Sequence, residues 1–543
     1  MSGRFWPRSQ SGKVTAVVTT AALAVGAAIA VPAAAGTAPA RSGAAAAPYA
    51  GPQLKLMAAQ NHITVFGFPV KQGSKKVLVL IDPGIWLASL GSSLQFDVGR
   101  ASYARPMTIT QIISRPGRAP LDRPLPANML DGWTGLKGMM SISVKDSAGK
   151  VVIHGGFPMC PDSFDAERAT DNGPVNSPFP TQCGAFDPFP LGEVWGIAKG
   201  WAIDPVETSA VTPYLLTAGA TYTVTESITP RFMNWLHVSA RDATASVEVT
   251  VQTQTSGKGP AGAQVAWASH PASVPAMNNP PRSVLPDMVP LPAWNINPLT
   301  VQGHDWLNFA ATVWIGGNGP LDVEGFRSGG SKIMPAWQYF YQDGKVIGRT
   351  RAGTMGFDSA KGHDHWHFEQ FAEYQLLNAG KKLVVRSQKV GFCIAPSDSV
   401  DMLLPGAVWQ VPFIGFGGQC GSPTALWVRE MLPVGWGDTY LQFLAGQAFD
   451  ITSLPNGTYY LEVVANPERV LRETSYGNDV SLRKIIISGK KGHRHVFVPA
   501  YFGVDQENSG TPPVPSPSPS ASPTLTVTAT ATATASPSPG QGP

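Results

Sequence analysis

The chain is poor in charged residues, which make up only 14% of its 543 positions. The 40 Lys and Arg against 36 Asp and Glu give a formal net charge of +4, and four cations stand unopposed by any acid in the first fifty residues. The remainder is close to neutral, so nothing in the charge balance indicates a nucleic-acid partner. The abundant Gly (57) and Pro (50) favour β-structure and loops over long helices.

Long apolar runs are missing beyond the first 35 residues. There, a basic head (Arg4, Arg8, Lys13) precedes an alanine-rich apolar run over 14–31 and small residues suited to cleavage. This pattern predicts a secretory signal peptide over 1–35 and therefore a secreted, extracellular protein. A retained membrane anchor is the alternative, because the apolar run is long.

Cysteine is scarce, with four residues in the chain. An even number in an exported protein predicts disulfides, and the expected pairs are Cys160 with Cys183 and Cys393 with Cys420. For Cys393, a role as a metal ligand is the competing interpretation.

Composition divides the chain into successive segments. Residues 36–51 are expected to form a flexible lead-in, 52–255 a β-rich domain of unknown role, and 256–283 a linker. Residues 284–500 predict a second antiparallel sandwich. Residues 501–543, rich in Pro, Ser and Thr, predict a disordered tail of the kind that crosses cell walls. The expected fold class is all-β, with two β-sandwich-like domains.

Histidine is rare, with ten in the chain, yet His363, His365 and His367 fall within five residues. The alternating pattern that follows predicts a strand, in which the three imidazoles share one face at a spacing of about 6.6 Å. On a helix the same spacing would fan them around the axis. Imidazole suits copper, zinc, iron and nickel, so the cluster predicts a metal site, with chance surface histidines as the alternative.

Two strand-like runs flank residues 378–380, which predicts a hairpin. A three-residue loop would put Gly380 in the left-handed conformation and pair Glu369 with Lys389. Lys389 would then lie on the sheet face of the histidines, and a slip of one residue would send it to the other face.

The histidine triplet, the residues after it over 368–379, and the segment 388–393 together resemble the copper site and cofactor lysine of the lysyl oxidases. Further similar blocks follow in order along the chain, over 437–440, 450–467 and 475–480. The resemblance covers about residues 284–500 and implies a lysyl oxidase-like copper domain in a secreted, bacterial member of the family.

The resemblance implies copper bound by His363, His365 and His367, and a lysine tyrosylquinone cofactor formed by cross-linking Lys389 to Tyr440. The implied activity is that of a copper amine oxidase of the protein-lysine 6-oxidase type. Such an enzyme converts primary amines, either peptidyl lysine or small amines, to aldehydes with O2 and releases hydrogen peroxide and ammonia.

A carboxylate base is needed for this reaction, and Glu369 is the expected one, with Asp364, Asp398 and Asp438 as other candidates. The family has a histidine where Glu373 stands here, a departure expected to change the surroundings of the copper ligands.

A calcium site is a further implication of the resemblance. Asp287, Asn478 and Asp479 match positions that help to hold calcium in the family, and oxygen ligands suit that ion. Carboxylates and amides that cap turns are the alternative explanation of the same residues.

Two functions without amine oxidation stay open. One is a secreted copper- or zinc-binding module that uses the same histidines. The other is a wall-associated adhesion protein, in which residues 52–255 and the tail carry the function.

Overall fold

The computed structural model describes residues 51–508, apart from 72, 164, 185–186, 207–212, 254–273, 328–330, 360–364, 388, 390, 412–419, 422 and 445. All of the described residues belong to one unit of the chain. The predicted signal peptide, most of the lead-in and most of the tail lie outside the described residues.

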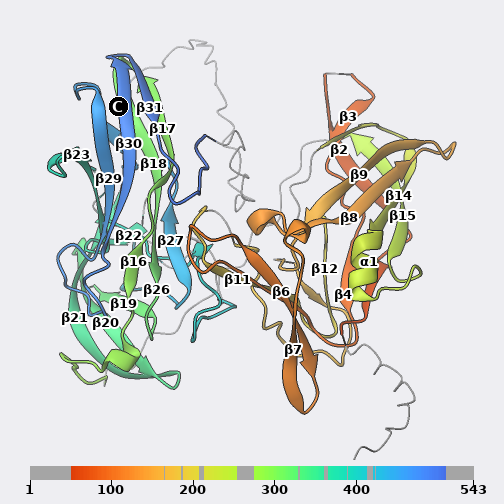
Figure 1. The fold of residues 1–543 in the computed structure, drawn as a ribbon, viewed down its shortest axis with the longest axis horizontal. Helices are drawn as coiled ribbons and strands as arrows, with labels where there is room; N and C mark the ends of the chain where they lie inside the picture. The colour runs from red at the N-terminus through yellow and green to blue at the C-terminus, as the bar shows by residue number, and fades with distance from the viewer. Residues whose placement is uncertain are drawn as a thin grey trace, which may run out of the picture. The chain divides into compact units, whose positions relative to one another are not determined.

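Strands dominate the described residues, so the predicted all-β class is confirmed (Figure 1). The helical elements are α1 (Pro230–Leu236) and the 3-10 turns η1 (Ala127–Met129), η2 (Gly132–Thr134) and η3 (Arg282–Val284). Pro230 suits the first turn of α1, and His237 ends the helix in the left-handed conformation. Within the described part of the chain, no helix has the length and apolarity needed to cross a membrane.

Residues 54–253 form three sheets. The first contains β1 (Leu54–Ala58), β4 (Ile85–Ser89), β12 (Trp201–Ile203) and β10 (Glu167–Arg168). The second contains β11 (Gly192–Ile197), β5 (Leu94–Gly99), β6 (Thr108–Arg115) and β7 (Arg118–Pro124). The third contains, in order, β13 (Tyr214–Thr217), β3 (Lys76–Val79), β2 (His62–Pro69), β15 (Thr244–Thr253), β14 (Thr221–Ile228), β8 (Leu136–Lys145) and β9 (Val151–Met159).

Strict alternation explains the strands of the seven-stranded sheet. Along β14, Tyr222 and Val224 are buried while the threonines between them face outward. A period of two places alternate side chains on opposite faces, so one face enters the core and the other meets solvent. The β-structure predicted for this part of the chain is confirmed, for example by β3, β8, β14 and β15.

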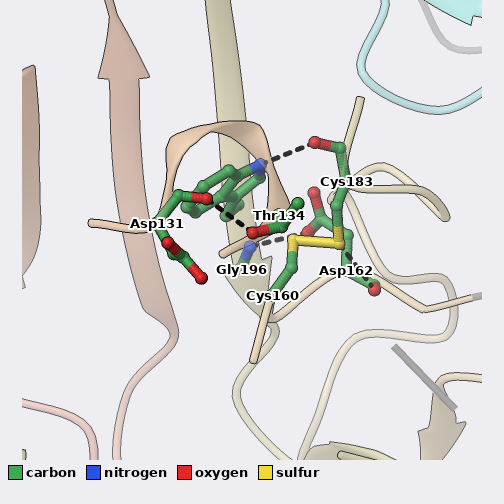
Figure 2. Close-up of a disulfide and its surroundings, with 7 residues drawn as sticks. Asp131, Thr134, Cys160, Asp162, Cys183 and Gly196 are labelled. Carbon is green, nitrogen blue, oxygen red and sulfur yellow. Dashed lines mark hydrogen bonds between the residues drawn. A yellow bond between two sulfur atoms is a disulfide. The ribbon is translucent and has the colours of Figure 1, made fainter. Parts of the chain in front are cut away.

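A disulfide between Cys160 and Cys183 fastens the irregular segment that precedes β11 (Figure 2). The Asp162 carboxylate accepts the Gly196 N–H at 2.7 Å, and the Trp195 indole donates to the Cys183 carbonyl at 3.1 Å. The predicted first disulfide is therefore confirmed, and its surroundings tie it to a fully buried strand.

Residues 288–497 form three further sheets. The first contains β16 (Met288–Pro290), β18 (His304–Ile315), β27 (Trp436–Tyr440) and β25 (Asp398–Ser399), with β17 (Trp294–Val301) and β28 (Ala448–Asp450) also paired to β18. The second contains β22 (His365–Phe368), β21 (Lys345–Asp358), β20 (Ile333–Gln342), β19 (Leu321–Phe326) and β26 (Trp427–Leu432). The third contains β24 (Leu383–Arg386), β23 (Ala372–Asn378), β29 (Gly457–Ala465), β30 (Val480–Lys490) and β31 (His493–Phe497).

One apolar core joins these three sheets. It includes Val313 of β18, Met355 of β21 and Leu461 of β29, and also the aromatic rings of Phe392 and Tyr440. The segments that carry the candidate site are therefore fixed by core packing from several sheets.

The predicted hairpin exists between β23 and β24, but its turn differs from the expectation. Lys381 has the positive φ, 57°, and Gly380 does not. The Asn378 carboxamide oxygen accepts the N–H groups of Gly380 and Lys382 at 3.0 and 3.1 Å. This side-chain turn moves the left-handed residue one position along the chain.

The predicted pairing of Glu369 with Lys389 is wrong. The chain turns at 369–371, between β22 and β23, and the pairing that continues the hairpin is a bridge between Phe368 and Phe392. This register differs from the expected one by two residues. A shift by an even number leaves each paired side chain on the face of the sheet that was expected for it.

Candidate active site

Strand β22 brings two histidine side chains together. His365 and His367 lie on one face with their Nε2 atoms 2.9 Å apart, while Trp366 and Phe368 are fully buried on the other face. The two imidazole rings meet edge to face, with centroids 4.6 Å apart. The period of a strand thus separates an apolar anchor from a polar pair of imidazoles.

Backbone contacts hold β22 from two sides. Phe368 and Phe392 exchange two N–H···O bonds of 2.8 and 3.0 Å, and the Trp366 N–H donates to the Cys420 carbonyl at 2.8 Å. Cys393 and Cys420 form a disulfide. The predicted second disulfide is therefore confirmed, and the alternative of Cys393 as a copper ligand is wrong.

The donor set of β22 fits a transition metal in type, because imidazole nitrogens suit copper and zinc. In this structure the two Nε2 atoms share a hydrogen bond of 2.9 Å. The Asp358 carboxylate lies 3.8 Å from His367 Nδ1, where it can orient the ring. The third predicted ligand, His363, lies outside the described residues. Among those that are described, no group of three or more His, Cys, Asp or Glu side chains is arranged as a metal site.

Lys389 and Tyr440, predicted as cofactor precursors, lie in contact. The Lys389 Nζ atom stands over the Tyr440 ring, 4.4 Å from its centroid, and the lysine is only 7% exposed.

Phe392 joins this pair to the histidine strand. Its ring lies 5.1 Å from the Tyr440 ring, and its backbone forms the bridge to Phe368. The Tyr440 hydroxyl accepts the Cys393 N–H at 2.7 Å, which fixes the phenol. A Cβ atom on Gly391 would lie 2.7 Å from His367 Cβ, so glycine is needed for this close approach.

Burial controls the ionisation of the pair. Desolvation lowers the pKa of Lys389 to about 8, although the nearby Asp438 and Asp358 favour its charged form. Asp438, two residues before Tyr440 on β27, is completely buried, and this burial raises its pKa well above the usual range. Burial, together with the Asp438 charge, raises the pKa of Tyr440 as well. Burial therefore shifts both the amine and the phenol toward their neutral forms.

Two carboxylates singled out from the sequence lie elsewhere. Glu369 is exposed, and its carboxylate accepts a hydrogen bond from the Thr354 hydroxyl at 2.7 Å. Glu373, at the position where the family has a histidine, forms an ion pair with Arg386 across β23 and β24.

Sequence inspection missed Glu430 and Tyr374. Glu430 is fully buried and accepts the Ile394 N–H at 2.9 Å, which positions the segment after Cys393. Tyr374 packs edge to face on Phe392, with centroids 5.8 Å apart. The available signal was the alternation of β26, which places a glutamate on its buried face.

A second cluster contains the three residues expected at a calcium site. The Asn478 amide donates to the Asp287 carboxylate at 2.9 Å, and one side-chain oxygen on each of Asp287, Asn478 and Asp479 is buried without a hydrogen-bond partner. Burial raises the pKa of Asp479 to about 6 and that of nearby Glu473 to about 7, and the Asp287 charge adds to both shifts. These carboxylates are buried and repel one another, and oxygens next to them have no hydrogen-bond partner. Oxygen donors of this kind suit a hard cation.

A pair of imidazoles beside a buried lysine–tyrosine pair, inside an all-β core, defines a candidate site for metal-assisted oxidation. Residues 420–495 match the sequence model of the family described as lysyl oxidase. The chain is also 27% identical over 154 residues to lysyl oxidase homolog 2 of Gallus gallus, and 27% identical over 141 residues to lysyl oxidase homolog 4 of Mus musculus. These alignments cover 28% and 26% of this chain, but only 18% and 17% of the relatives.

Residues 420–495 are therefore similar to the lysyl oxidase family, and the chain spans less than a fifth of the length of the vertebrate relatives that it matches. Tyr440, Asn478 and Asp479 lie inside the matched segment 420–495, whereas the histidines and Lys389 precede it.

Proposed function

We propose that this protein is a secreted copper-dependent amine oxidase of the protein-lysine 6-oxidase type. The observation that carries the proposal is the position of the Lys389 amine over the Tyr440 ring, at 4.4 Å and almost without solvent exposure. Burying an ammonium group is costly, and a reaction at this amine would account for its burial.

His363, His365 and His367 would hold the copper, and Lys389 and Tyr440 would form the lysine tyrosylquinone. When present, copper with O2 supplies the oxidation of the tyrosine ring, and the quinone supplies the electrophile that oxidises the substrate amine.

Lys389 contributes a nucleophile that is ready near neutral pH. With a pKa of about 8, roughly a quarter of its amine would be neutral at pH 7.5, against about one part in a thousand at an ordinary lysine pKa. Its position over the ring supplies the orientation, because Tyr440 is held by core packing and Lys389 is buried against it.

Asp438 is the better-supported proton acceptor. It is buried on the same strand face as Tyr440 and interacts electrostatically with Lys389, whereas Glu369 is exposed and bonded to Thr354. A carboxylate with a raised pKa beside an amine with a lowered pKa can exchange a proton at little cost.

The proposed net reaction converts R–CH2–NH2, O2 and water to R–CHO, ammonia and hydrogen peroxide. The substrate would be a primary amine, either peptidyl lysine in a partner protein or a small amine. Secretion, association with the cell wall and a bacterial origin belong to the same proposal.

The boundaries at residues 52–255, 256–283, 284–500 and 501–543 are likewise proposed as two domains, a linker and a tail. We further propose that Asp287, Asn478 and Asp479 bind calcium, with Glu473 as an additional oxygen donor. Their unsatisfied oxygens and raised carboxylate pKa values support a structural cation near the start of the second domain.

The test is peroxide release from copper-loaded protein with lysine peptides and small amines, together with mass spectrometry of tryptic digests. Wild-type protein should give peroxide and a peptide pair joined between Lys389 and Tyr440, and Lys389→Ala and Tyr440→Phe should lose both. Lys382→Ala, an exposed lysine of the same hairpin, is the matched control and should keep both.

If the protein binds copper or zinc but forms no cross-link, the result would favour a non-catalytic metal-binding module. Wall retention unchanged in Lys389→Ala, without peroxide from the wild type, would favour an adhesion protein.

A further inference from the structure

Six apolar side chains are exposed together at one end of the seven-stranded sheet. Leu78 of β3 pairs with Phe68 of β2 on one side and with Leu215 of β13 on the other. The three are 43%, 66% and 54% exposed. With the exposed neighbours that follow the same alternation they form what we call the hairpin patch: Phe66, Phe68, Val70, Leu78, Leu80 and Leu215.

The same sheet provides its own reference for a solvated face. On β14 and β15 the outward positions carry polar side chains, mostly hydroxyl groups that bond across the strands, such as Thr221 to Thr250 at 2.9 Å and Thr225 to Ser246 at 2.8 Å. The outward face therefore changes from polar groups to phenyl and isobutyl groups between β15 and β2. That change is unexpected if water covers the whole face.

The inward positions of these strands are apolar as well. Val77, Val79 and Leu216 are buried in the core, so β3 and β13 carry apolar side chains on both faces. Such strands are typical of sheets that are covered on both sides.

Basic residues surround the turn of this hairpin. Lys71, Lys75 and Lys76 are exposed at the turn between β2 and β3, and Lys76 reaches Thr217 of β13 at 3.0 Å. Residues 51–81 contain four lysines and not one aspartate or glutamate. The patch therefore combines an apolar surface with three exposed lysines at its margin.

We propose that the hairpin patch binds the surface of an anionic lipid bilayer, so that the protein is a peripheral membrane binder. The phenyl and leucine side chains would enter the boundary between head groups and acyl chains, and the lysines at the turn would contact anionic head groups. Apolar area plus electrostatic attraction is the combination that drives interfacial binding. This proposal is independent of the amine oxidase activity.

A second copy of the chain is a poorer occupant. A stable protein interface buries about 800 Å² on each partner, more than six half-exposed side chains offer. Pairing two patches would also bring six lysine ammonium groups to one interface, and residues 51–81 offer no carboxylate to compensate them.

The experiment is co-sedimentation of the full chain with vesicles of phosphatidylcholine, either pure or mixed with phosphatidylglycerol. The first variant is Phe66→Thr/Phe68→Thr/Leu78→Thr, because threonine occupies the outward positions of the neighbouring strands and favours β-structure. The second is Lys71→Gln/Lys75→Gln. The matched control is Val151→Thr/Val152→Thr, which removes exposed valines from β9 at the opposite edge of the same sheet.

The wild type and the valine control should bind mixed vesicles, and binding should weaken as salt is raised. The lysine variant should bind roughly thirtyfold more weakly, from about tenfold per 1.4 kcal/mol and ~1 kcal/mol per lysine. The threonine variant should lose binding while keeping the wild-type thermal midpoint.

Equal binding to neutral vesicles, or full binding by the threonine variant, would overturn the proposal. Absence of wild-type binding to mixed vesicles would do the same. A dimer in light scattering that the threonine variant abolishes, without vesicle binding, would assign the patch to self-association instead.

Discussion

Replacing Lys389 by methionine should stabilise the copper-free protein at neutral pH. The side chain is 7% exposed and stands over an aromatic ring, so its ammonium has lost most of its hydration. Methionine fills a similar volume without a charge. Burial raises the pKa of Asp438 and the Lys389 charge lowers it, so Asp438 can take up a proton once the ammonium is gone.

The size of this stabilisation and the pH range in which it appears follow from the linkage between proton binding and folding. Burial lowers the pKa of Lys389 from 10.5 to about 8, and a shift of about 2.5 units corresponds to a ceiling of ~3.4 kcal/mol. Between pH 8 and 10.5 the unfolded chain binds the proton that the folded chain has lost. The free energy of unfolding of the wild type therefore rises with pH in this window. Below pH 8 the penalty is fully present, and above pH 10.5 it is gone.

Urea unfolding of chelator-treated protein at pH 7, 8, 9 and 10 measures the effect. The free energy of unfolding of Lys389→Met should exceed that of the wild type by about 1–3 kcal/mol at pH 7. This difference should shrink steadily toward pH 10. Lys382→Met, on the exposed end of the hairpin, should show no advantage that depends on pH. A constant difference between Lys389→Met and wild type at all four pH values would refute the desolvation of this lysine.

Gly391→Ala should weaken copper binding at least tenfold in a competition titration, because the added Cβ would lie 2.7 Å from His367 Cβ. Gly380→Ala is the control and should bind copper normally, because the nearest atom to its added Cβ would be 3.4 Å away. Asp438→Asn should slow cross-link formation by about 10²–10⁴-fold with copper binding intact, and an equal loss in Glu369→Gln would contradict the assignment. Calcium should raise the thermal midpoint of chelator-treated protein at pH 7.5 but lose this effect toward pH 5, as Glu473 and Asp479 take up protons near pH 7 and 6. Asp479→Asn should reduce the calcium effect, and an unchanged response in that variant would argue against the site.

Local patterns in the sequence were sufficient for the strands and the disulfides. Alternating burial along β14 and β30, and the type of turn at Asp343 and Gly344, both with positive φ, follow from side-chain period and turn chemistry. The division of residues 54–253 and of residues 288–497 into three sheets each could not be predicted from such local patterns. It depends on pairings between distant strands, such as β18 with β27, that no local pattern encodes.

The register near the site shows where local reasoning fails. The loop length suggested Gly380 as the left-handed residue, but the Asn378 side chain satisfies two backbone N–H groups and moves that conformation to Lys381. The burial of Lys389 was likewise hidden, because it depends on Tyr440 from a distant segment as well as on the nearby Phe392. Glu430 could be recognised only once the buried face of β26 was known.

The cost of burying Lys389 and the reactivity of its amine have the same physical origin. Desolvation disfavours the ammonium, which lowers both the pKa of the amine and the free energy of unfolding of the protein at neutral pH. Active sites commonly carry such a trade between stability and function. Substitutions that restore stability at this position should therefore be those that abolish the cross-link to Tyr440. A variant such as Lys389→Arg keeps a permanent charge in the same pocket. It should therefore neither gain stability nor form the cross-link.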